Sequence, residues 1–170
     1  DSYTFMERFA DPGYRYHAAA ARVGTAMMMR LANADVLPYD YVEFARTMRR
    51  YLAPIDANLK AKGWTGSSAP LAAAIDRMER AADAFATARD AALAAGIPTA
   101  RQAATNRALL QVERAMTRAE GLRSRPWYRN LIYVADVDNG YSTMVFPSVN
   151  EAIRYGDPAL FGRELADLVQ

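Results

Sequence analysis

The residue with the clearest chemical potential is the single histidine of the chain, His17, which follows Tyr16. A catalytic zinc ion needs three protein ligands and a structural one needs four, so one imidazole cannot hold zinc. Taken alone, His17 is interpreted as a packed or solvated side chain. A Ser–His–Asp triad cannot be identified from spacing either, because hydroxyls and carboxylates occur throughout the chain while only one histidine can act as the base.

Other reactive groups are missing or have a plainer interpretation. The chain has no cysteine, which excludes disulfides and thiol catalysis. No glycine-rich phosphate loop and no metal-spaced histidine cluster occurs. The run Met27–Met29 is interpreted as core filling, because methionine fills irregular gaps and two of the three can face inward. Arg46, Arg49 and Arg50 share one helical face, which predicts a solvated or salt-bridged rim.

The charge pattern bears on partners and on membranes. Twenty-one basic and 19 acidic residues give a formal charge of +2, and the two kinds are mixed along the whole chain. Because no polybasic segment exists, we predict no nucleic-acid partner. No run of about 18 apolar residues is free of charge, so we expect no membrane span. The chain starts at Asp1 without a signal-peptide pattern, and we expect it to begin within a longer protein.

The elements that position these residues are mainly helices. Apolar residues at three- and four-residue steps predict helices over about 14–34, 41–62, 70–95 and 99–118. Asp40 three residues ahead of Glu43 predicts an N-cap, and Thr99 with Gln102 predicts a capping box. Gly63 is expected to end the second helix. Long amphipathic helices joined by short Gly/Ser/Pro loops indicate an antiparallel bundle.

The character of the chain changes after Gly121. Two runs rich in aromatic and β-branched residues, 131–134 and 141–146, flank the sequence Asp138-Asn139-Gly140. Asn-Gly between such runs predicts a β-hairpin turn. Short helices are expected from Pro147 to Gly156 and after Asp157-Pro158. The predicted fold is therefore mainly α, an antiparallel four-helix-type bundle with a small irregular β-hairpin insertion.

Two segments resemble one known family. The first holds Asp1-Ser2-Tyr3, Glu7, Phe9, Asp11-Pro12, Tyr16-His17, Leu31-Ala32-Asn33 and Val36-Leu37-Pro38. The second holds residues 121–129, Ile132-Tyr133, Asn139, Tyr141 and Phe146-Pro147. Both resemble the C-terminal region of the glutamate carboxypeptidase II and transferrin receptor family, whereas residues 56–115 match only in helical character.

The resemblance implies a division of the chain and a function. Residues 1–36 correspond to the C-terminal helix of a zinc peptidase domain. Residues 37–170 correspond to a helical dimerisation domain with a substrate-facing hairpin at about 131–146, which pairs with its copy in a two-fold homodimer. The resemblance implies a di-zinc, carboxypeptidase-like exopeptidase that releases C-terminal residues from peptide substrates, with this domain completing the active site. The isolated chain is expected to be inactive and to hold no zinc.

The resemblance also implies site residues. In the peptidase branch, two zinc ions activate a bridging hydroxide and polarise the peptide carbonyl. His17 matches the final zinc ligand, in the full-length protein only, and Tyr16 matches the catalytic tyrosine that hydrogen-bonds the tetrahedral intermediate. Asn139, Gly140 and Tyr141 match the substrate-binding hairpin. Gly140 stands where glutamate-cleaving members have a lysine, and losing that ammonium removes a charge-assisted bond to a carboxylate. We therefore expect no strong preference for C-terminal glutamate.

Two other functions remain open. The chain could be a non-catalytic, receptor-like helical interaction domain, although the retained Tyr16-His17 pair favours the peptidase, since a receptor has no need of a zinc ligand. It could also be an unrelated helical adaptor, in which case the matching segments are coincidence. The residues upstream of Asp1 would decide between them. Relatives work outside the cytoplasm, so the resemblance implies an extracytoplasmic location.

Overall fold

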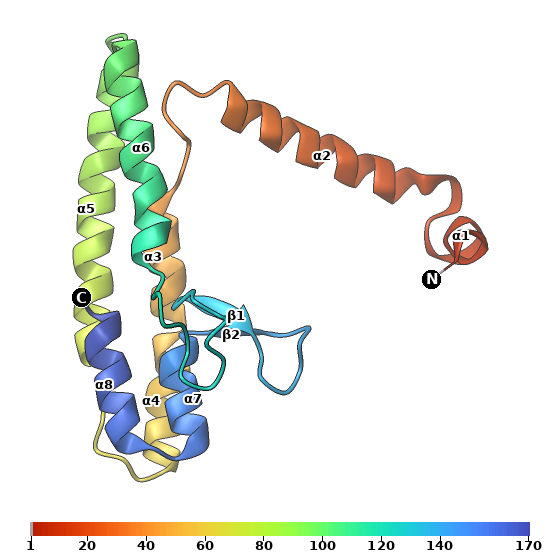
Figure 1. The fold of residues 1–170 in the computed structure, drawn as a ribbon. Helices are drawn as coiled ribbons and strands as arrows, with labels where there is room; N and C mark the ends of the chain where they lie inside the picture. Colours follow the sequence, from red (N-terminus) through yellow and green to blue (C-terminus); the bar gives the residue numbers. More distant parts are fainter. Residues whose placement is uncertain (1) are drawn as a thin grey trace. The chain divides into compact units, whose positions relative to one another are not determined.

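The structure, a computed structural model, describes residues 2–170, and the chain divides into two compact units. The first unit ends at Pro38 and the second runs from Tyr39 to Gln170. The boundary after residue 36 that the resemblance implies stays a prediction. Figure 1 shows the elements of both units in chain order.

The first unit consists of short helical turns followed by one long helix. Helix α1 (Tyr3–Phe5) continues into a π-helical turn (Met6–Ala10), and a 3-10 turn (Pro12–Tyr14) precedes α2 (Arg15–Ala32). Tyr14 adopts the left-handed conformation, with φ of 54°, directly before α2 begins. The helix predicted over about 14–34 is confirmed.

The methionines of α2 do not fill a core. Met27, Met28 and Met29 are 60%, 71% and 59% exposed, and no residue of α2 is buried. The predicted core-filling role is therefore wrong within the first unit. Apolar periodicity identifies one face of a helix but not the surface that covers it, and α2 has no covering partner inside its own unit.

The second unit is a helical bundle that carries one β-hairpin. Its helices are α3 (Tyr41–Arg50), α4 (Leu52–Ala61), α5 (Ala69–Ala94), α6 (Thr99–Ala115), α7 (Pro147–Tyr155) and α8 (Pro158–Leu168). Helix α3 packs against α5, and α7 packs against α8. In Figure 1 the long helices α5 and α6 run in opposite directions. The predicted mainly helical fold with a small antiparallel hairpin is confirmed.

The core of the second unit forms where α3, α4, α5, α7 and α8 meet. Its buried members are Ala45, Met48, Leu52, Ile55, Leu59, Leu71, Ile75, Phe146, Val149, Ala152, Ile153, Leu160, Phe161 and Leu165. Phe146 and Ile55 are among the largest side chains that are completely buried. Full burial of one such side chain stabilises a fold by about 1.5–3 kcal/mol. The second strand of the hairpin is therefore anchored directly in the core, because the buried Phe146 follows that strand in the sequence.

Two helix ends in the second unit follow the predicted capping residues. The side chain of Asp40 accepts a hydrogen bond from the Glu43 N–H at 2.9 Å at the start of α3. Gly63, with φ of +66°, ends α4, and the N–H of Trp64 donates to the carbonyl of Leu59 at 3.0 Å. This 6→1 bond after a left-handed glycine is the Schellman ending.

The second predicted helix is not continuous. It breaks at Tyr51, so that α3 ends at Arg50 and α4 begins at Leu52. The interruption has a backbone cause, because Pro54 has no N–H to donate to the carbonyl of Arg50. The prediction of one helix from 41 to 62 is therefore wrong at this point, although its apolar stripe still enters the core on both sides of the break.

The predicted capping box of α6 is also wrong. The helix is preceded by Pro98 as its N-cap, with no side-chain cap, and Thr99 is its first helical residue. Gln102 instead donates through Nε2 to the carbonyl of Ile97 at 3.1 Å. Pro98 replaces Thr99 because its extended backbone already presents the carbonyl that accepts from Gln102 N–H at 3.0 Å.

The hairpin consists of β1 (Tyr133–Ala135) and β2 (Thr143–Val145), paired antiparallel with Val134 opposite Met144. Its loop covers residues 136–142 and is wider than the predicted Asn139-Gly140 turn. The reason is the side chain of Asp136, whose Oδ1 accepts from the N–H groups of Asp138 and Asn139 at 2.9 and 3.0 Å. This local bonding replaces the tight turn with a broader, carboxylate-centred loop.

Candidate functional site

The first candidate site lies at the start of α2, where Asp11 and His17 meet. The carboxylate of Asp11 accepts hydrogen bonds from the backbone N–H of Tyr16 at 3.0 Å and of His17 at 2.9 Å. The same carboxylate contacts Nδ1 of the His17 ring. Asp11 therefore satisfies two free N–H groups at the start of a helix, where such donors lack intrahelical partners.

The hydrogen bonds to Asp11 keep its carboxylate ionised. Burial by itself would raise its pKa, since Asp11 is only 3% exposed. The bonds from the His17 ring and from the backbone N–H groups of His17 and Tyr16 outweigh burial and lower the pKa of Asp11 from 3.8 to about 2. An ionised Asp11 accepts from a protonated Nδ1, so Nε2 is the imidazole nitrogen left for any other partner.

The predicted metal and catalytic residues are adjacent in sequence, but they do not form a complete site. The side chain of His17 is 52% exposed, and Tyr16 is 76% exposed. Within residues 2–170, no group of three or more histidine, cysteine, aspartate or glutamate side chains could hold a metal ion. The described residues therefore supply fewer than the three ligands of a catalytic zinc site here, and Asp11 contacts the His17 ring through Nδ1.

The predicted substrate-binding residues lie together in the hairpin loop of the second unit. Asn139 organises the loop, since its Oδ1 accepts from the Tyr141 N–H at 3.1 Å and its Nδ2 donates to Ser142 Oγ at 3.1 Å. Tyr141 is fully exposed. A Cβ atom at Gly140 would meet no other atom within 4 Å. The loop thus exposes the phenol of Tyr141 to solvent, next to residue 140, where there is room for a side chain.

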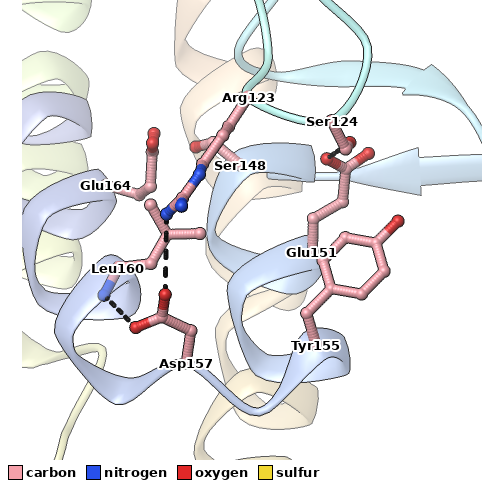
Figure 2. A pocket seen from close by; sticks show the side chains of 8 residues that line it. All are labelled: Arg123, Ser124, Ser148, Glu151, Tyr155, Asp157, Leu160 and Glu164. Carbon is pink, nitrogen blue, oxygen red and sulfur yellow. Dashed lines mark hydrogen bonds and ion pairs between the residues drawn. The ribbon is translucent and has the colours of Figure 1, made fainter.

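A buried ion pair contacts the first strand of the hairpin. Arg125 donates to Oε1 of Glu151 through Nε at 3.0 Å and through Nη2 at 2.6 Å. Its Nη1 donates to the carbonyl of Ala135, the last residue of β1, at 2.7 Å. Ser124 contacts the other carboxylate oxygen of Glu151, as Figure 2 shows. The guanidinium is also stacked over the ring of Tyr128, 4.8 Å from its centroid.

A second cation ties the segment before the hairpin to α8. Arg118 Nη1 donates to Glu164 at 2.8 Å and to Asp167 at 2.9 Å, and its Nε donates to the carbonyl of Gly121 at 3.1 Å. Burial alone would lower the pKa of Arg118, but its bonds to Glu164 and Asp167 raise it above the ordinary value. The guanidinium therefore stays charged and fixes where the segment leaves α6.

A pocket of about 330 Å³ opens between these two ion pairs. Figure 2 shows that it is framed by Arg123 and Ser124 on one side and by side chains of α7 and α8 on the other. Arg123 lies 3.5 Å from Asp157, which also caps α8 by accepting from the Leu160 N–H at 2.8 Å. Within the described residues, Ser148 Oγ is buried in the pocket wall without a hydrogen-bond partner.

Sequence reasoning missed the supporting residues Arg118, Arg125 and Glu151. Arg125 falls within the stretch 121–129 that resembles the peptidase family, which was a usable signal. The sequence around Glu151 gave no such signal, because a glutamate on a short amphipathic helix is normally a surface charge. Only the packing of α7 against α8 shows that it is 3% exposed.

The fold and the hairpin together define the second unit as a helical bundle module with an anchored, polar loop. The family model that describes the transferrin receptor-like dimerisation domain matches residues 67–170. This covers α5, α6, the hairpin, α7 and α8. The chain therefore belongs to the transferrin receptor-like dimerisation domain family.

Similar proteins carry peptidase names. A probable glutamate carboxypeptidase of Arabidopsis thaliana is 31% identical over 153 residues, which are 90% of this chain and 22% of that protein. A probable glutamate carboxypeptidase of Zea mays is 26% identical over 161 residues, again 90% of this chain and 22% of the relative. The aminopeptidase NAALADL1 of Rattus norvegicus is 26% identical over 155 residues, 89% of this chain and 20% of the relative.

The chain thus spans about a fifth of the length of the curated relatives that it matches. These matches extend well beyond the family model, since they cover about nine tenths of the chain. As for membranes, none of the helices formed by residues 2–170 has both the length and the apolar character that a bilayer span requires.

Proposed function

We propose that this chain is the homodimerisation and active-site-completing part of a zinc exopeptidase of the carboxypeptidase type. The observation that carries the proposal is the family match over residues 67–170 combined with relatives that are named peptidases over nine tenths of the chain. Since the chain spans about a fifth of those relatives, the catalytic centre would be completed by residues outside it.

The first part of the proposal is self-association of the second unit. A domain of the transferrin receptor-like dimerisation family is expected to pair with its own copy, and a two-fold pair uses one surface on both partners. The second unit has a suitable apolar groove of about 470 Å³. The groove is lined mainly by apolar side chains, among them Met78 of α5, Val112 of α6 and Leu168 of α8.

Sedimentation equilibrium of the protein at micromolar concentration tests the pairing, and we expect a dimer. Val112→Glu would place a charge in the groove and is expected to raise the dissociation constant at least tenfold. Gln111→Glu introduces the same charge at an exposed neighbouring position of α6 and serves as the control. A clean monomer of the unchanged protein would contradict the dimerisation role.

The second part concerns the hairpin loop, which we propose to contact the substrate. Support comes from the resemblance at Asn139 and Tyr141 and from the exposed position of the Tyr141 phenol. The isolated chain is then inactive on peptides, and the full-length protein that contains it is active. Steady-state kinetics on dipeptides with C-terminal glutamate and with neutral C-terminal residues test this part. No hydrolysis of either class by the full-length protein would favour the receptor-like interaction domain instead.

Zinc belongs to the proposal for the full-length protein only. His17 could offer Nε2, with Asp11 orienting the ring through Nδ1. A zinc ion bound there would activate water and polarise a carbonyl, but the described residues provide no group of three ligands around His17. The contact with Asp11 also gives the imidazole a structural role at the start of α2, independent of any metal. An extracytoplasmic location is likewise a proposal that rests on the resemblance, and fractionation of source cells would test it.

A further inference from the structure

We propose that Arg125 and Glu151 are positioning residues that fix the hairpin loop 136–142 in place for substrate. The proposal rests on the substrate-contacting function proposed above for that loop. Neither residue is argued to touch the substrate. Both act through the backbone of β1, whose last residue, Ala135, directly precedes the loop.

The contact that transmits this effect is the bond from Arg125 Nη1 to the Ala135 carbonyl at 2.7 Å. The strand ladder ends at this residue, since Ala135 opposite Thr143 is its last pair. One further backbone bond joins the N–H of Asp136 to the carbonyl of Ser142 at 2.8 Å. Beyond it, residues 138–142 are all exposed and make no contribution to a buried core. The position of the loop therefore depends on the bonds at its two ends and on the ion pair between Asp138 and Arg154, and Arg125 holds the first end.

Glu151 in turn fixes the position of Arg125. Its Oε1 accepts from Nε at 3.0 Å and from Nη2 at 2.6 Å, so the planar guanidinium is held in one orientation with Nη1 directed at Ala135. Arg125 is 8% exposed and Glu151 is 3% exposed. Three donors in a fixed fork make this geometry specific to arginine, because a lysine ammonium on a flexible stem cannot reproduce it.

Helix α7 supplies further ties to the same hairpin. Asn150, beside Glu151, donates through Nδ2 to the carbonyl of Val145 at 2.6 Å and so holds the end of β2. Arg154, one turn further along, forms an ion pair with Asp138 in the loop. One face of α7 therefore contacts the first strand through Arg125, the second strand directly, and the loop directly.

The base of this arrangement is rigid, because Val149, Ala152 and Ile153 of α7 are buried in the core. A buried ion pair contributes little net stability compared with apolar residues of similar volume, since two charges must be removed from water. Replacing both partners together should therefore preserve the fold while removing the bond to Ala135. This separation makes the positioning role testable apart from stability.

The test uses the full-length protein with the double substitution Arg125→Met and Glu151→Met, and Arg125→Lys as a second variant. Amide hydrogen exchange of residues 136–142 is expected to become at least tenfold faster, while exchange in α5 stays unchanged. KM for the cleaved peptide is expected to rise about tenfold, with kcat changed less than threefold. Arg123→Met is the matched control, because Arg123 is nearby but 64% exposed on its side chain and contacts Asp157 instead.

The outcomes separate this inference from the proposed function. Unchanged exchange in the loop of a variant whose α5 exchange is also unchanged would overturn the positioning role. Faster loop exchange with unchanged KM in an active protein would overturn it as well. If the unchanged full-length protein hydrolyses no peptide, the proposed function fails, and the exchange measurement still decides whether Arg125 and Glu151 position the loop.

Discussion

Asp11 binds His17 at two places, accepting the backbone N–H at 2.9 Å and contacting Nδ1 of the ring. The two residues are six positions apart, and the turn between them contains Gly13 and the left-handed Tyr14. The chain therefore folds back so that one carboxylate meets both the start of α2 and its third residue. This contact makes the start of α2 sensitive to the charge of Asp11.

Acid is expected to loosen the start of α2 through Asp11. The folded pKa of Asp11, about 2, lies below its ordinary value of 3.8, so its stabilisation is complete above about pH 4 and is lost as the pH falls toward 2. Asp11→Asn should remove this acid-sensitive component and weaken α2 above pH 4. Hydrogen exchange of the α2 amides between pH 2 and pH 6 measures it. Glu7→Gln, an exposed change in the same unit, should leave the acid response intact.

His17→Gln separates the structural role of the imidazole from the metal role. The amide side chain of glutamine is a poor substitute for the ring that contacts Asp11, so exchange at the start of α2 should increase. In the full-length protein, zinc content by elemental analysis should fall if His17 is the ligand that the resemblance implies. Unchanged zinc content with faster exchange would contradict the ligand role and leave the structural one. Asp35→Asn, outside this contact, is the control.

Much of the helical architecture could be predicted from periodicity and caps. Leu71, Ile75 and Ala82 repeat at helical spacing and are buried in α5, as their pattern indicates. The predictions that failed depend on a single missing backbone N–H or on surfaces that are distant in the sequence. Pro54 lacks one N–H, which divides a predicted helix. The methionines of α2 are exposed, and the local pattern does not say what surface, if any, covers them.

In the candidate site, too, the residues fixed by near neighbours in the sequence could be predicted, and those paired across long stretches of the chain could not. Asn139 and Tyr141 could be identified because they lie in a family-like segment, and their loop geometry is set by neighbours within three residues. Arg125 and Glu151 are 26 residues apart in sequence. Their pairing depends on the packing of α7, which no spacing rule in the sequence describes.

Gly121→Ala is expected to destabilise the second unit strongly. Gly121 has φ of +68°, and a Cβ there would lie 2.6 Å from the carbonyl carbon of Pro126 and 2.8 Å from the carbonyl oxygen of Tyr128. These backbone atoms cannot move aside easily, so we expect a loss of about 2–4 kcal/mol in the free energy of unfolding. Urea denaturation measures the loss.

Gly63→Ala provides the matched control for that substitution. Gly63 has a similar φ of +66°, but a Cβ there would meet no atom within 4 Å. Its substitution should therefore cost only the left-handed conformation, about 1 kcal/mol. Equal losses at the two positions would show that the close approach of Gly121 to the Pro126–Tyr128 backbone is not what requires a glycine.

Gly140→Lys is expected to create a preference for C-terminal glutamate in the full-length protein. The position has open space and φ outside the left-handed region, so a lysine fits without strain. An ammonium beside Tyr141 could form a charge-assisted bond to the substrate carboxylate, and a bond of about 1.5–3 kcal/mol corresponds to at least a tenfold gain in kcat/KM for glutamate over neutral residues. Gly140→Met, of similar length and without charge, should give no such gain. An equal gain with methionine would mean that bulk rather than charge acts there, and no gain with either would place the loop away from the substrate carboxylate.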